Sequence, residues 1–446
     1  DGTTKTFGIR PKDRRRHMYI VGKSGMGKST LMENMILQDI YAGKGVCFID
    51  PLGDSAQKII DHIPAYRHKD VVYIDPSDVD NPVGINILEA DKNQPPFLIA
   101  TQVLDLLNKI WAGAWSGRME YFLNNALLAL LEVHGNTFLG VSKMFTDKQF
   151  RKFIVENTEN VVVKSFWENE YMSYSDSYKN EAAGAIINKV NQFLSSKMMR
   201  GIMGLSRSTI NFRDVMDQQK ILIVNLSKGK IGGSNSRLLG GLIVTKLLMA
   251  AMSRVDTPES ERKDFYFYVD EFQNVISSSF STILSEARKY RLNLILANQF
   301  LGQFEETENQ AVMEAIFGNV GTLVSFQIGA NDAEVFAKQM FPDLEDAHSH
   351  FLGLDRGQIF IKLFLETKNL YTFFANTLPP LYSEFKGNSN KVIRSSREQF
   401  TRPADVVNAE IDKYFAESVI YNQDGTYLRA RVPKRRRKRK EKPEEN

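Results

Sequence analysis

The 446-residue sequence contains a single cysteine, Cys47, which excludes an internal disulfide framework and a thiolate metal site. Cys47 lies in an apolar stretch, so we expect a buried thiol in a reducing cytosol. The six histidines form no ligand pattern, because His348 and His350, two residues apart, are more typical of a polar loop. The sequence therefore indicates no metal site built from thiolate or imidazole ligands.

Long apolar runs are also missing. No run of 18 uncharged apolar residues is present, so no segment is predicted to span a membrane. The strongest candidate, residues 238–252, contains Lys246 and is typical of a buried helix. Because the chain begins at Asp1 rather than at methionine, we expect a fragment or processed form that lacks upstream domains or membrane anchors.

The composition, 43% hydrophobic and 25% charged, is that of a soluble globular protein with one large domain or two ordinary ones. The net charge of +4 is unevenly spread, since residues 434–446 carry +5. This tail has no apolar residue to bury, so we expect it to be disordered and either solvated or bound to a polyanion. A second basic cluster precedes the first predicted strand and consists of Arg10, Lys12, Arg14, Arg15 and Arg16.

One strong motif is present near the start of the chain. Gly22, Gly27, Lys28 and Ser29 fit the phosphate-binding pattern G-x-x-x-x-G-K-[ST]. The apolar residues 18–21 predict a buried strand before it, and helical apolar spacing follows it, which is the context that this motif requires. The residues predicted to bind the nucleotide are Gly22, Lys23, Ser24, Gly25, Met26, Gly27, Lys28, Ser29 and Thr30.

The chemistry of this loop predicts ATP and Mg²⁺ as ligands. Its glycines let backbone N–H groups turn towards a polyphosphate, and the following helix adds partial positive charge at its N-terminus. Lys28 would reach the β and γ phosphates, and the Ser29 hydroxyl would ligate Mg²⁺.

A second half of the site is predicted about 240 residues later. The aromatic and β-branched run at residues 265–269 is typical of a strand buried on both faces, and it ends in Asp270 and Glu271. Asp270 would hold the Mg²⁺ water shell, and Glu271 would deprotonate the attacking water. A further strand, residues 293–297, leads to Gln299, which is either a γ-phosphate sensor or an ordinary loop residue.

The pattern predicts an α/β fold interrupted by helices. Strands and helices alternate over residues 17–88, helices fill residues 91–215, and strands resume at residues 221–226, followed by a Gly/Ser loop at 228–236. A helix is expected near residues 404–415. The predicted parts are residues 1–90 and 216–380 of one nucleotide-binding domain, an inserted all-α domain at 91–215, a C-terminal extension at 381–432 and the basic tail at 433–446.

This order of motifs resembles the HerA/FtsK group of RecA-like motor ATPases, and most closely the TraG/TraD-type coupling proteins of type IV secretion and conjugation. The resemblance spans about residues 5–380, and the segments that carry it are residues 22–30, 50–54, 265–272 and 286–299. It implies a RecA-like P-loop NTPase with a mainly parallel central sheet, and it matches residues 91–215 to the all-α domain of coupling proteins. The last 70 residues match no family, and the transmembrane helices usual in coupling proteins are absent from this sequence.

The resemblance also implies a hexameric ring with ATP between subunits that pumps DNA through a central channel. The sensor glutamine of the family falls on Gln299, and its arginine finger falls on Arg288. Because the helix predicted after Asp270, at about residues 280–290, must return to the opposite edge of the sheet, Arg288 near its end would act on the neighbouring subunit's ATP. Arg291 and Arg237 are the next candidates. Expected partners are DNA, further copies of the chain, and relaxase or secretion-channel proteins at the cytoplasmic face of the inner membrane.

Other functions remain open at this point. The chain could be a secretion ATPase that moves or unfolds protein without DNA, or a HerA-like DNA-processing motor. A nucleotide-dependent scaffold is disfavoured, because a pure binding site has no use for the base Glu271. Lys228 and Lys230 in the Gly/Ser loop would either follow DNA phosphates in the pore or be solvated.

Overall fold

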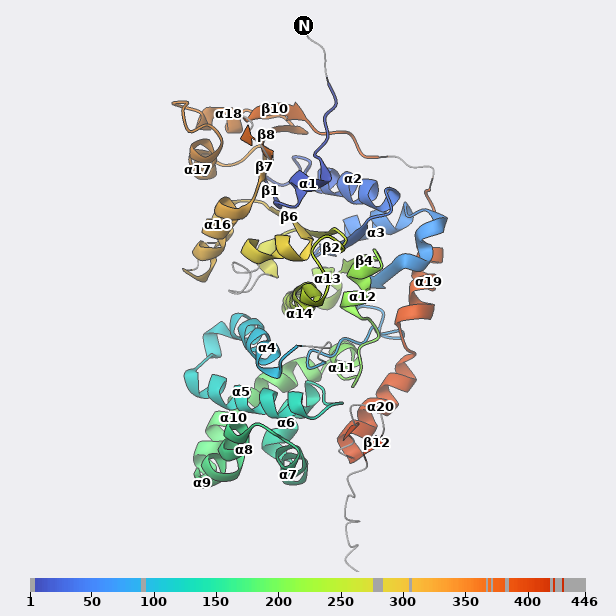
Figure 1. Ribbon diagram of the computed structural model, residues 1–446, viewed down its shortest axis with the longest axis vertical. Helices are drawn as coiled ribbons and strands as arrows, with labels where there is room; N and C mark the ends of the chain where they lie inside the picture. The colour runs from blue at the N-terminus through green and yellow to red at the C-terminus, as the bar shows by residue number, and fades with distance from the viewer. Residues whose placement is uncertain are drawn as a thin grey trace, which may run out of the picture.

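The structure is a computed structural model that describes residues 5–89, 94–275, 284–304, 307–365, 368–369, 372–381, 385–417, 420–421 and 427–428. Figure 1 shows a sheet with helices on both faces in its upper half and a lobe of helices below. The long helix α14 (Gly233–Met252) lies between the two, and α19 (Ser389–Phe400) and α20 (Ala404–Glu417) run along one side.

The central sheet has the strand order β10-β8-β7-β1-β6-β5-β2-β4-β3, and its seven strands from β7 to β3 are parallel. The strands are β1 (Met18–Val21), β2 (Gly45–Asp50), β3 (Val71–Ile74), β4 (Ile221–Asn225), β5 (Phe265–Val269), β6 (Leu292–Asn298), β7 (Thr322–Ser325), β8 (Gln358–Leu365), β9 (Lys368–Asn369) and β10 (Phe373–Asn376). Strands β8 and β10 are antiparallel additions at one edge. The predicted mainly parallel sheet is therefore confirmed.

Alternate strand residues enter two separate cores because successive side chains of a strand point to opposite faces. Tyr19 and Val21 face the core shared with the helical lobe, whereas Met18 and Ile20 face the other core. The helices that cover this other face are α2 (Lys28–Tyr41), α3 (Asp54–Asp61) and α19 (Ser389–Phe400). The strands next to β1 are thus buried on both faces, and their carboxyl ends meet at one edge.

Between β3 and β4 the described residues form helices and contain no strand. The helices are α4 (Pro96–Ile110), α5 (Gly117–Glu132), α6 (Leu139–Thr146), α7 (Lys148–Glu156), α8 (Val161–Ser165), α9 (Tyr171–Ser173), α10 (Asp176–Leu194), α11 (Lys197–Met203) and α12 (Phe212–Asp217), with a π-helical stretch at Phe166–Glu170. Their apolar residues join the core on the α14 side of the sheet.

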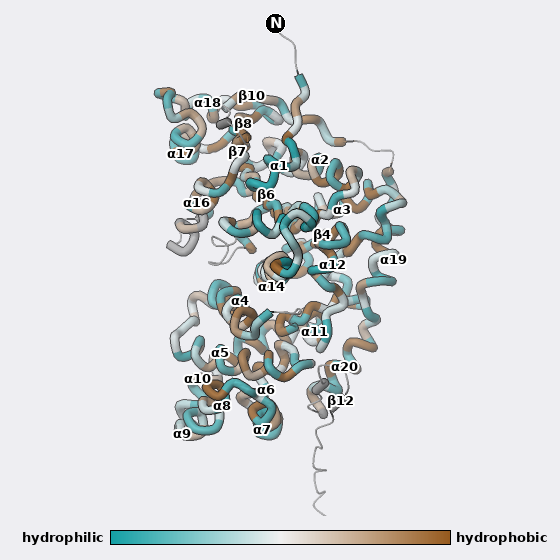
Figure 2. The backbone as a smooth tube through the Cα atoms, viewed as in Figure 1, coloured by the Kyte–Doolittle hydropathy of each residue, from teal (hydrophilic) through white to brown (hydrophobic). Residues whose placement is uncertain are grey.

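The prediction of a Gly/Ser loop at residues 228–236 is wrong. These residues form the short helix α13 (Lys228–Ile231) and the first turn of α14. Tertiary contacts outweigh the low helix propensity of glycine here, since Ser236 Oγ donates a hydrogen bond to the Leu226 carbonyl (3.0 Å). Figure 2 shows apolar residues concentrated on α14 between the sheet and the lobe.

Helix α14 is the only helix in the described part of the chain that is long and apolar enough to cross a membrane. However, 89% of its apolar window, within residues Gly233–Asp256, is buried inside the protein. Lys246, within this helix, is itself 8% exposed and donates to the Glu89 carbonyl (2.6 Å). The helix therefore has the burial expected of a core helix.

The remaining elements lie at the central sheet, except the pair β11 and β12, which lies beside α20 at the level of the helical lobe (Figure 1). They are α1 (Pro11–Arg14), α16 (Thr307–Asn319), α17 (Ala330–Met340), α18 (His348–Leu352) and the two-stranded pair β11 (Ile420–Tyr421) and β12 (Tyr427–Leu428). His348 and His350, expected in a polar loop, lie in or at α18. Helix α20 agrees with the helix predicted near residues 404–415, whereas α19 was not predicted. The basic tail lies outside the described residues.

Candidate active site

The phosphate-binding loop connects the end of β1 to helix α2, which begins at Lys28. Gly25 (φ +80°) and Gly27 (φ +116°) adopt left-handed conformations that favour glycine. A Cβ at Gly22 would lie 2.5 Å from Phe326 Cβ at the end of β7, so only glycine allows this close approach. The local backbone thus explains why the glycines of the motif stand where they do.

Lys28 is the buried cation of the loop, with 6% exposure. Its ammonium donates to the Gly22 carbonyl and to the Lys23 carbonyl (3.1 Å). Burial lowers the pKa of Lys28, while the charges of Asp270 and Glu271 act in the opposite direction. The ammonium is therefore held by neutral acceptors inside the loop, where a polyphosphate would offer it charged ones.

Asp270 follows β5 at the same edge of the sheet, 6% exposed, and its Oδ2 lies 3.4 Å from Ser29 Oγ as a hydrogen-bond acceptor. Burial raises the pKa of Asp270 to about 6, and the charges of Glu271 and Asp50 add to this rise. Several carboxylates thus converge on one buried point beside Lys28. A divalent cation at this point would offset their repulsion, and carboxylate with hydroxyl is a donor set that suits Mg²⁺.

Asp50, at the end of β2, has a structural explanation. Its two carboxylate oxygens accept the backbone N–H groups of Leu52 and Ala56, both at 2.9 Å, and so fix the turn into α3. Gly53 in this turn has φ +95°, and a Cβ there would lie 2.5 Å from Asn225 Oδ1. The Asp-Pro-x-Gly-Asp sequence is therefore a tight connection between β2, α3 and β4.

Glu271 is surrounded by carboxamides. It adopts a left-handed backbone conformation (φ +46°). Gln299 Nε2 donates to its Oε1 at 2.6 Å, and Gln273 Nε2 donates to its Oε2 at 2.6 Å. Gln303 Nε2 lies at 3.4 Å from the same Oε2. Gln299 therefore contacts the predicted base in this structure, from the bend that follows β6.

Arg288 lies away from this edge. It is exposed, in the 3₁₀ helix Ala287–Tyr290 that precedes β6, whereas the end of β6 pairs with Val21 at the phosphate-binding loop. The seven residues of β6 separate the two edges by about 20 Å. The structure therefore does not bring Arg288 to the phosphate-binding loop of its own chain. Part of the helix predicted at residues 280–290 lies outside the described residues, and its end is 3₁₀ rather than α-helical.

The two alternatives to Arg288 are in different positions. Arg291 pairs with Glu259 at 3.4 Å within its own chain. Arg237 is exposed in α14, close to the end of β4. In the described part of the chain, the side chain of Arg288 forms no hydrogen bond or ion pair, and only its carbonyl accepts the Arg291 N–H at 3.1 Å.

Sequence reasoning missed Gln273, Asn274 and Gln303. They reach Glu271 through the 3₁₀ turns that follow β5 and β6, and no spacing rule places turn side chains on a given carboxylate. The only available signal was their short distance along the chain from Asp270, Glu271 and Gln299.

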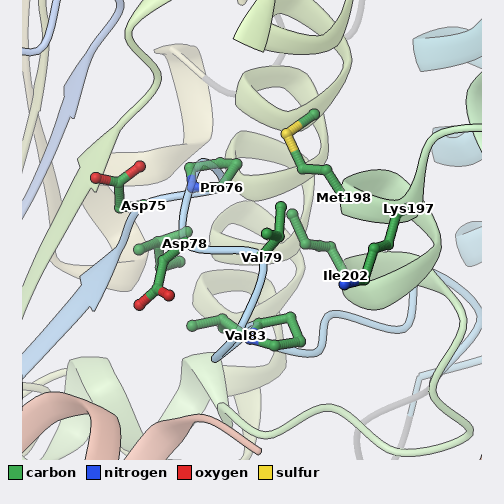
Figure 3. A pocket seen from close by; sticks show the side chains of 10 residues that line it. Asp75, Pro76, Asp78, Val79, Val83, Lys197, Met198 and Ile202 are labelled. Carbon is green, nitrogen blue, oxygen red and sulfur yellow. The ribbon is translucent and has the colours of Figure 1, made fainter. Parts of the chain in front are cut away.

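Cavities near the sheet differ in size. A cavity of about 430 Å³ beside the phosphate-binding loop is lined by Lys23, Ser24, Gln299, Phe300 and residues 329–332. Figure 3 shows another, with Asp75 and Val79 from the loop after β3 and Ile202 from α11 around it. The latter has a volume of only about 10 Å³, which holds at most one water. Of these two cavities, only the one at the phosphate-binding loop has room for a ligand larger than water.

Fold and site together define the class of the protein. A mainly parallel sheet with a phosphate-binding loop after β1 and an acidic pair after β5 is the arrangement of RecA-like P-loop ATPases. The family model described as "Helicase HerA, central domain" matches residues 3–247, more than half of the chain, so the chain belongs to this family. A second model, described as "TraM recognition site of TraD and TraG", matches residues 264–340.

Solved structures share this fold. The unbound bacterial conjugative coupling protein TrwBdeltaN70 has 13% identity and a TM-score of 0.59 over 84% of this chain and 89% of that one. The plasmid coupling protein TrwB in complex with ADP and Mg²⁺ has 12% identity and a TM-score of 0.59 over 84% and 88%. VirB4 of Thermoanaerobacter pseudethanolicus has 14% identity and a TM-score of 0.54 over 83% and 91%. A comparison with curated protein sequences found no match.

Proposed function

We propose that this protein is an ATP-hydrolysing motor of the conjugative, type IV secretion kind, which moves DNA through a ring of its own copies. The observation that carries the hydrolytic part is the convergence of Lys28, Ser29, Asp270 and Glu271 at one edge of the sheet. The membership in the HerA family and the fold shared with coupling proteins support the motor part.

Each residue has a distinct role in this proposal. Lys28 leaves the carbonyls of its loop to bind the β and γ phosphates, and backbone N–H groups of residues 22–30 bind the remaining phosphate oxygens. Ser29 and Asp270 would hold Mg²⁺, which supplies charge neutralisation to the phosphates when bound. Glu271 accepts the proton of the attacking water, and Gln299, which already contacts Glu271, orients that water.

Arg288 acts on the neighbouring copy in the ring. Its exposure and its position at the edge opposite its own phosphate-binding loop support this role. In a head-to-tail ring, such an edge faces the nucleotide of the next subunit. We infer a hexamer from the resemblance to coupling proteins.

The partners and location follow from the same relatives. The match of residues 264–340 to a model described by TraM recognition supports a relaxosome or secretion-channel partner. We propose that the protein works in the cytoplasm, at the cytoplasmic face of the inner membrane in its full-length form.

The test measures ATP hydrolysis with and without single- and double-stranded DNA over a range of salt concentrations. We expect DNA to stimulate hydrolysis, with a stimulation that falls steeply with salt because phosphate contacts release counterions. Imaging with an ATP analogue should show rings. Hydrolysis that responds to an unfolded protein substrate and not to DNA would instead establish the protein-moving alternative.

A further inference from the structure

A short basic segment lies at the carboxyl end of β4. Helix α13 carries Lys228 and Lys230, and Arg237 follows in α14; Lys228 is partly exposed and the other two are exposed. A Cβ at Gly229 or Gly232 would meet no atom within 4 Å, so this segment borders open solvent. A phosphate backbone can therefore approach these cations without displacing protein atoms.

Lys228 differs from its neighbours because its ammonium has a partner near the catalytic base. Lys228 Nζ donates to Asn274 Oδ1 at 3.1 Å. Asn274 in turn donates twice to the carbonyl of Glu271, through Nδ2 at 2.8 Å and through its backbone N–H at 3.0 Å. One side chain thus connects an exposed cation of α13 to the backbone of Glu271.

Packing joins the same two segments a second time. A Cβ at Gly240 of α14 would lie 2.4 Å from Val275 Cγ1, so this helix lies directly on the turn that follows Glu271. Helices α13 and α14 are joined through Gly232 alone. A shift of α13 therefore reaches the Glu271 turn through both the hydrogen bonds of Asn274 and the contact with Val275.

The turn at Glu271 combines a strained backbone with a buried acceptor that lacks a hydrogen bond in the part of the chain that the structure describes. The left-handed backbone of Glu271 is costly for a residue with a side chain. Its carboxylate is occupied by amide donors from Gln273 and Gln299. The other end of the Gln273 amide, Oε1, is buried without a hydrogen-bond partner in the described residues. A buried acceptor without a partner is unfavourable, so this arrangement is one that a change of contacts can relax.

We propose that Lys228 and Asn274 are positioning residues that link DNA binding at α13 to the release of Glu271. When a DNA phosphate binds Lys228, the ammonium leaves Asn274, because a charged acceptor competes better than a neutral amide oxygen. Asn274 then holds the Glu271 carbonyl less firmly, and Glu271 turns towards the attacking water. This inference rests on the proposed function and adds the means by which the substrate would control hydrolysis at the same site.

The experiment compares Lys228→Met with the matched control Lys230→Met. Both changes remove one cation from α13, but only Lys228 contacts Asn274. ATP turnover is measured without DNA and at saturating DNA for both variants, for Asn274→Ala and for the wild type. Circular dichroism and ADP binding establish that each variant is folded.

We expect Lys228→Met and Asn274→Ala to hydrolyse ATP roughly three- to tenfold faster than the wild type without DNA, the effect of one lost hydrogen bond to a charged group. Saturating DNA should add little to either. Lys230→Met should need more DNA for half-maximal stimulation but reach the maximum of the wild type. The double variant, Lys228→Met with Asn274→Ala, should equal the single variants, because both remove the same connection.

Three results would overturn the inference while the proposed function still stands. Full stimulation of Lys228→Met at saturating DNA would show that Lys228 does not report DNA binding. Identical behaviour of Lys228→Met and Lys230→Met would show that both lysines act only as phosphate contacts. Loss of hydrolysis in a folded Asn274→Ala would show that Asn274 supports the active state. If the wild type itself does not respond to DNA, the proposed function fails and the link to DNA fails with it.

Discussion

Asp270 gives the prediction with the most direct physical basis. Its pKa is raised from 3.8 to about 6, first by burial and then by the charges of Glu271 and Asp50. A raised carboxyl pKa stabilises the fold below the unfolded value near 4, and this stability is lost as the pH rises through about 6. Because one pKa unit corresponds to about 1.4 kcal/mol, the ionised carboxylate costs the nucleotide-free protein about 3 kcal/mol above pH 6.

Replacement of Asp270 by Asn removes this cost while it keeps the size of the side chain. We expect Asp270→Asn to be more stable than the wild type at pH 7.5, by up to about 3 kcal/mol, and equally stable near pH 4. The same carboxylate must be ionised to hold Mg²⁺. The affinity of the wild type for Mg²⁺-ADP should therefore fall about tenfold for each pH unit below about 6, and that of Asp270→Asn should be low and independent of pH.

Urea unfolding of the nucleotide-free protein from pH 4.5 to 8 measures the first effect, and calorimetric titration with ADP in Mg²⁺ measures the second. Asp54→Asn is the control, since Asp54 lies at the same edge of the sheet but is exposed. Equal pH dependence of stability in the wild type and Asp270→Asn would refute the burial argument. Unchanged Mg²⁺-ADP affinity in Asp270→Asn would remove Asp270 from the metal site.

Three further predictions test the site and the fold. Glu271→Gln should bind ATP but hydrolyse it about 10²- to 10⁴-fold more slowly in single-turnover assays; normal turnover would assign the base elsewhere. Arg288→Ala and Lys28→Ala should each be inactive alone. They should recover hydrolysis in verified mixed rings, because a mixed interface places an intact phosphate-binding loop beside an intact Arg288; no recovery would reject Arg288 as the arginine finger. Burial lowers the pKa of His17 to about 4, so the stability that neutral His17 provides above pH 6.5 is lost as the pH falls, by about 3 kcal/mol in total. His17→Asn should reduce this acid sensitivity in urea unfolding, and an unchanged pH profile would contradict it.

The sheet was predictable because its signals are local. The strands at residues 18–21 and 265–269 agree with the prediction at both ends, since each is a short apolar run buried on both faces. Strand β10 escaped prediction, because it is an edge strand whose residues are all partly or fully exposed and carry no strong pattern. Helices α6, α11 and α12 are short, and tertiary contacts rather than periodicity determine them.

The site was predictable in the parts that are contiguous in sequence. Gly22 to Ser29 form one motif, and Asp270 and Glu271 end one strand, so their placement at a common edge follows from parallel pairing. The carboxamides around Glu271 come from two turns on different strands, and only the three-dimensional structure brings them together. In the proposed ring, the target of Arg288 is the nucleotide of a neighbouring copy, and a single chain does not contain that interface.

The C-terminal extension carries no motif, but it forms hydrogen bonds with both the sheet and the helical lobe. Ser396 of α19 accepts the backbone N–H of Tyr73 at 2.8 Å and so satisfies the outer edge of β3. Further along, Tyr414 of α20 donates to Asn136 Oδ1 at 3.1 Å, and its carbonyl accepts the ammonium of Lys143 at 2.9 Å. Both of these partners belong to the helical lobe.

Besides the chain connections, sheet and lobe are joined through the middle of the molecule and along one side (Figure 1). The link along the side is the extension, and the link through the middle is α14, where a Cβ at Gly241 would lie 2.4 Å from Leu106 Cδ1 of α4. Helix α14 also contacts the turn after Glu271 through Gly240, so this one helix touches both that turn and α4. The extension opposes rotation of the lobe, since the hydrogen bonds of Tyr414 or Ser396 must break first. If the proposed hydrolysis moves the turn after Glu271, α14 would carry that movement to the lobe, and the hydrogen bonds of the extension would oppose it.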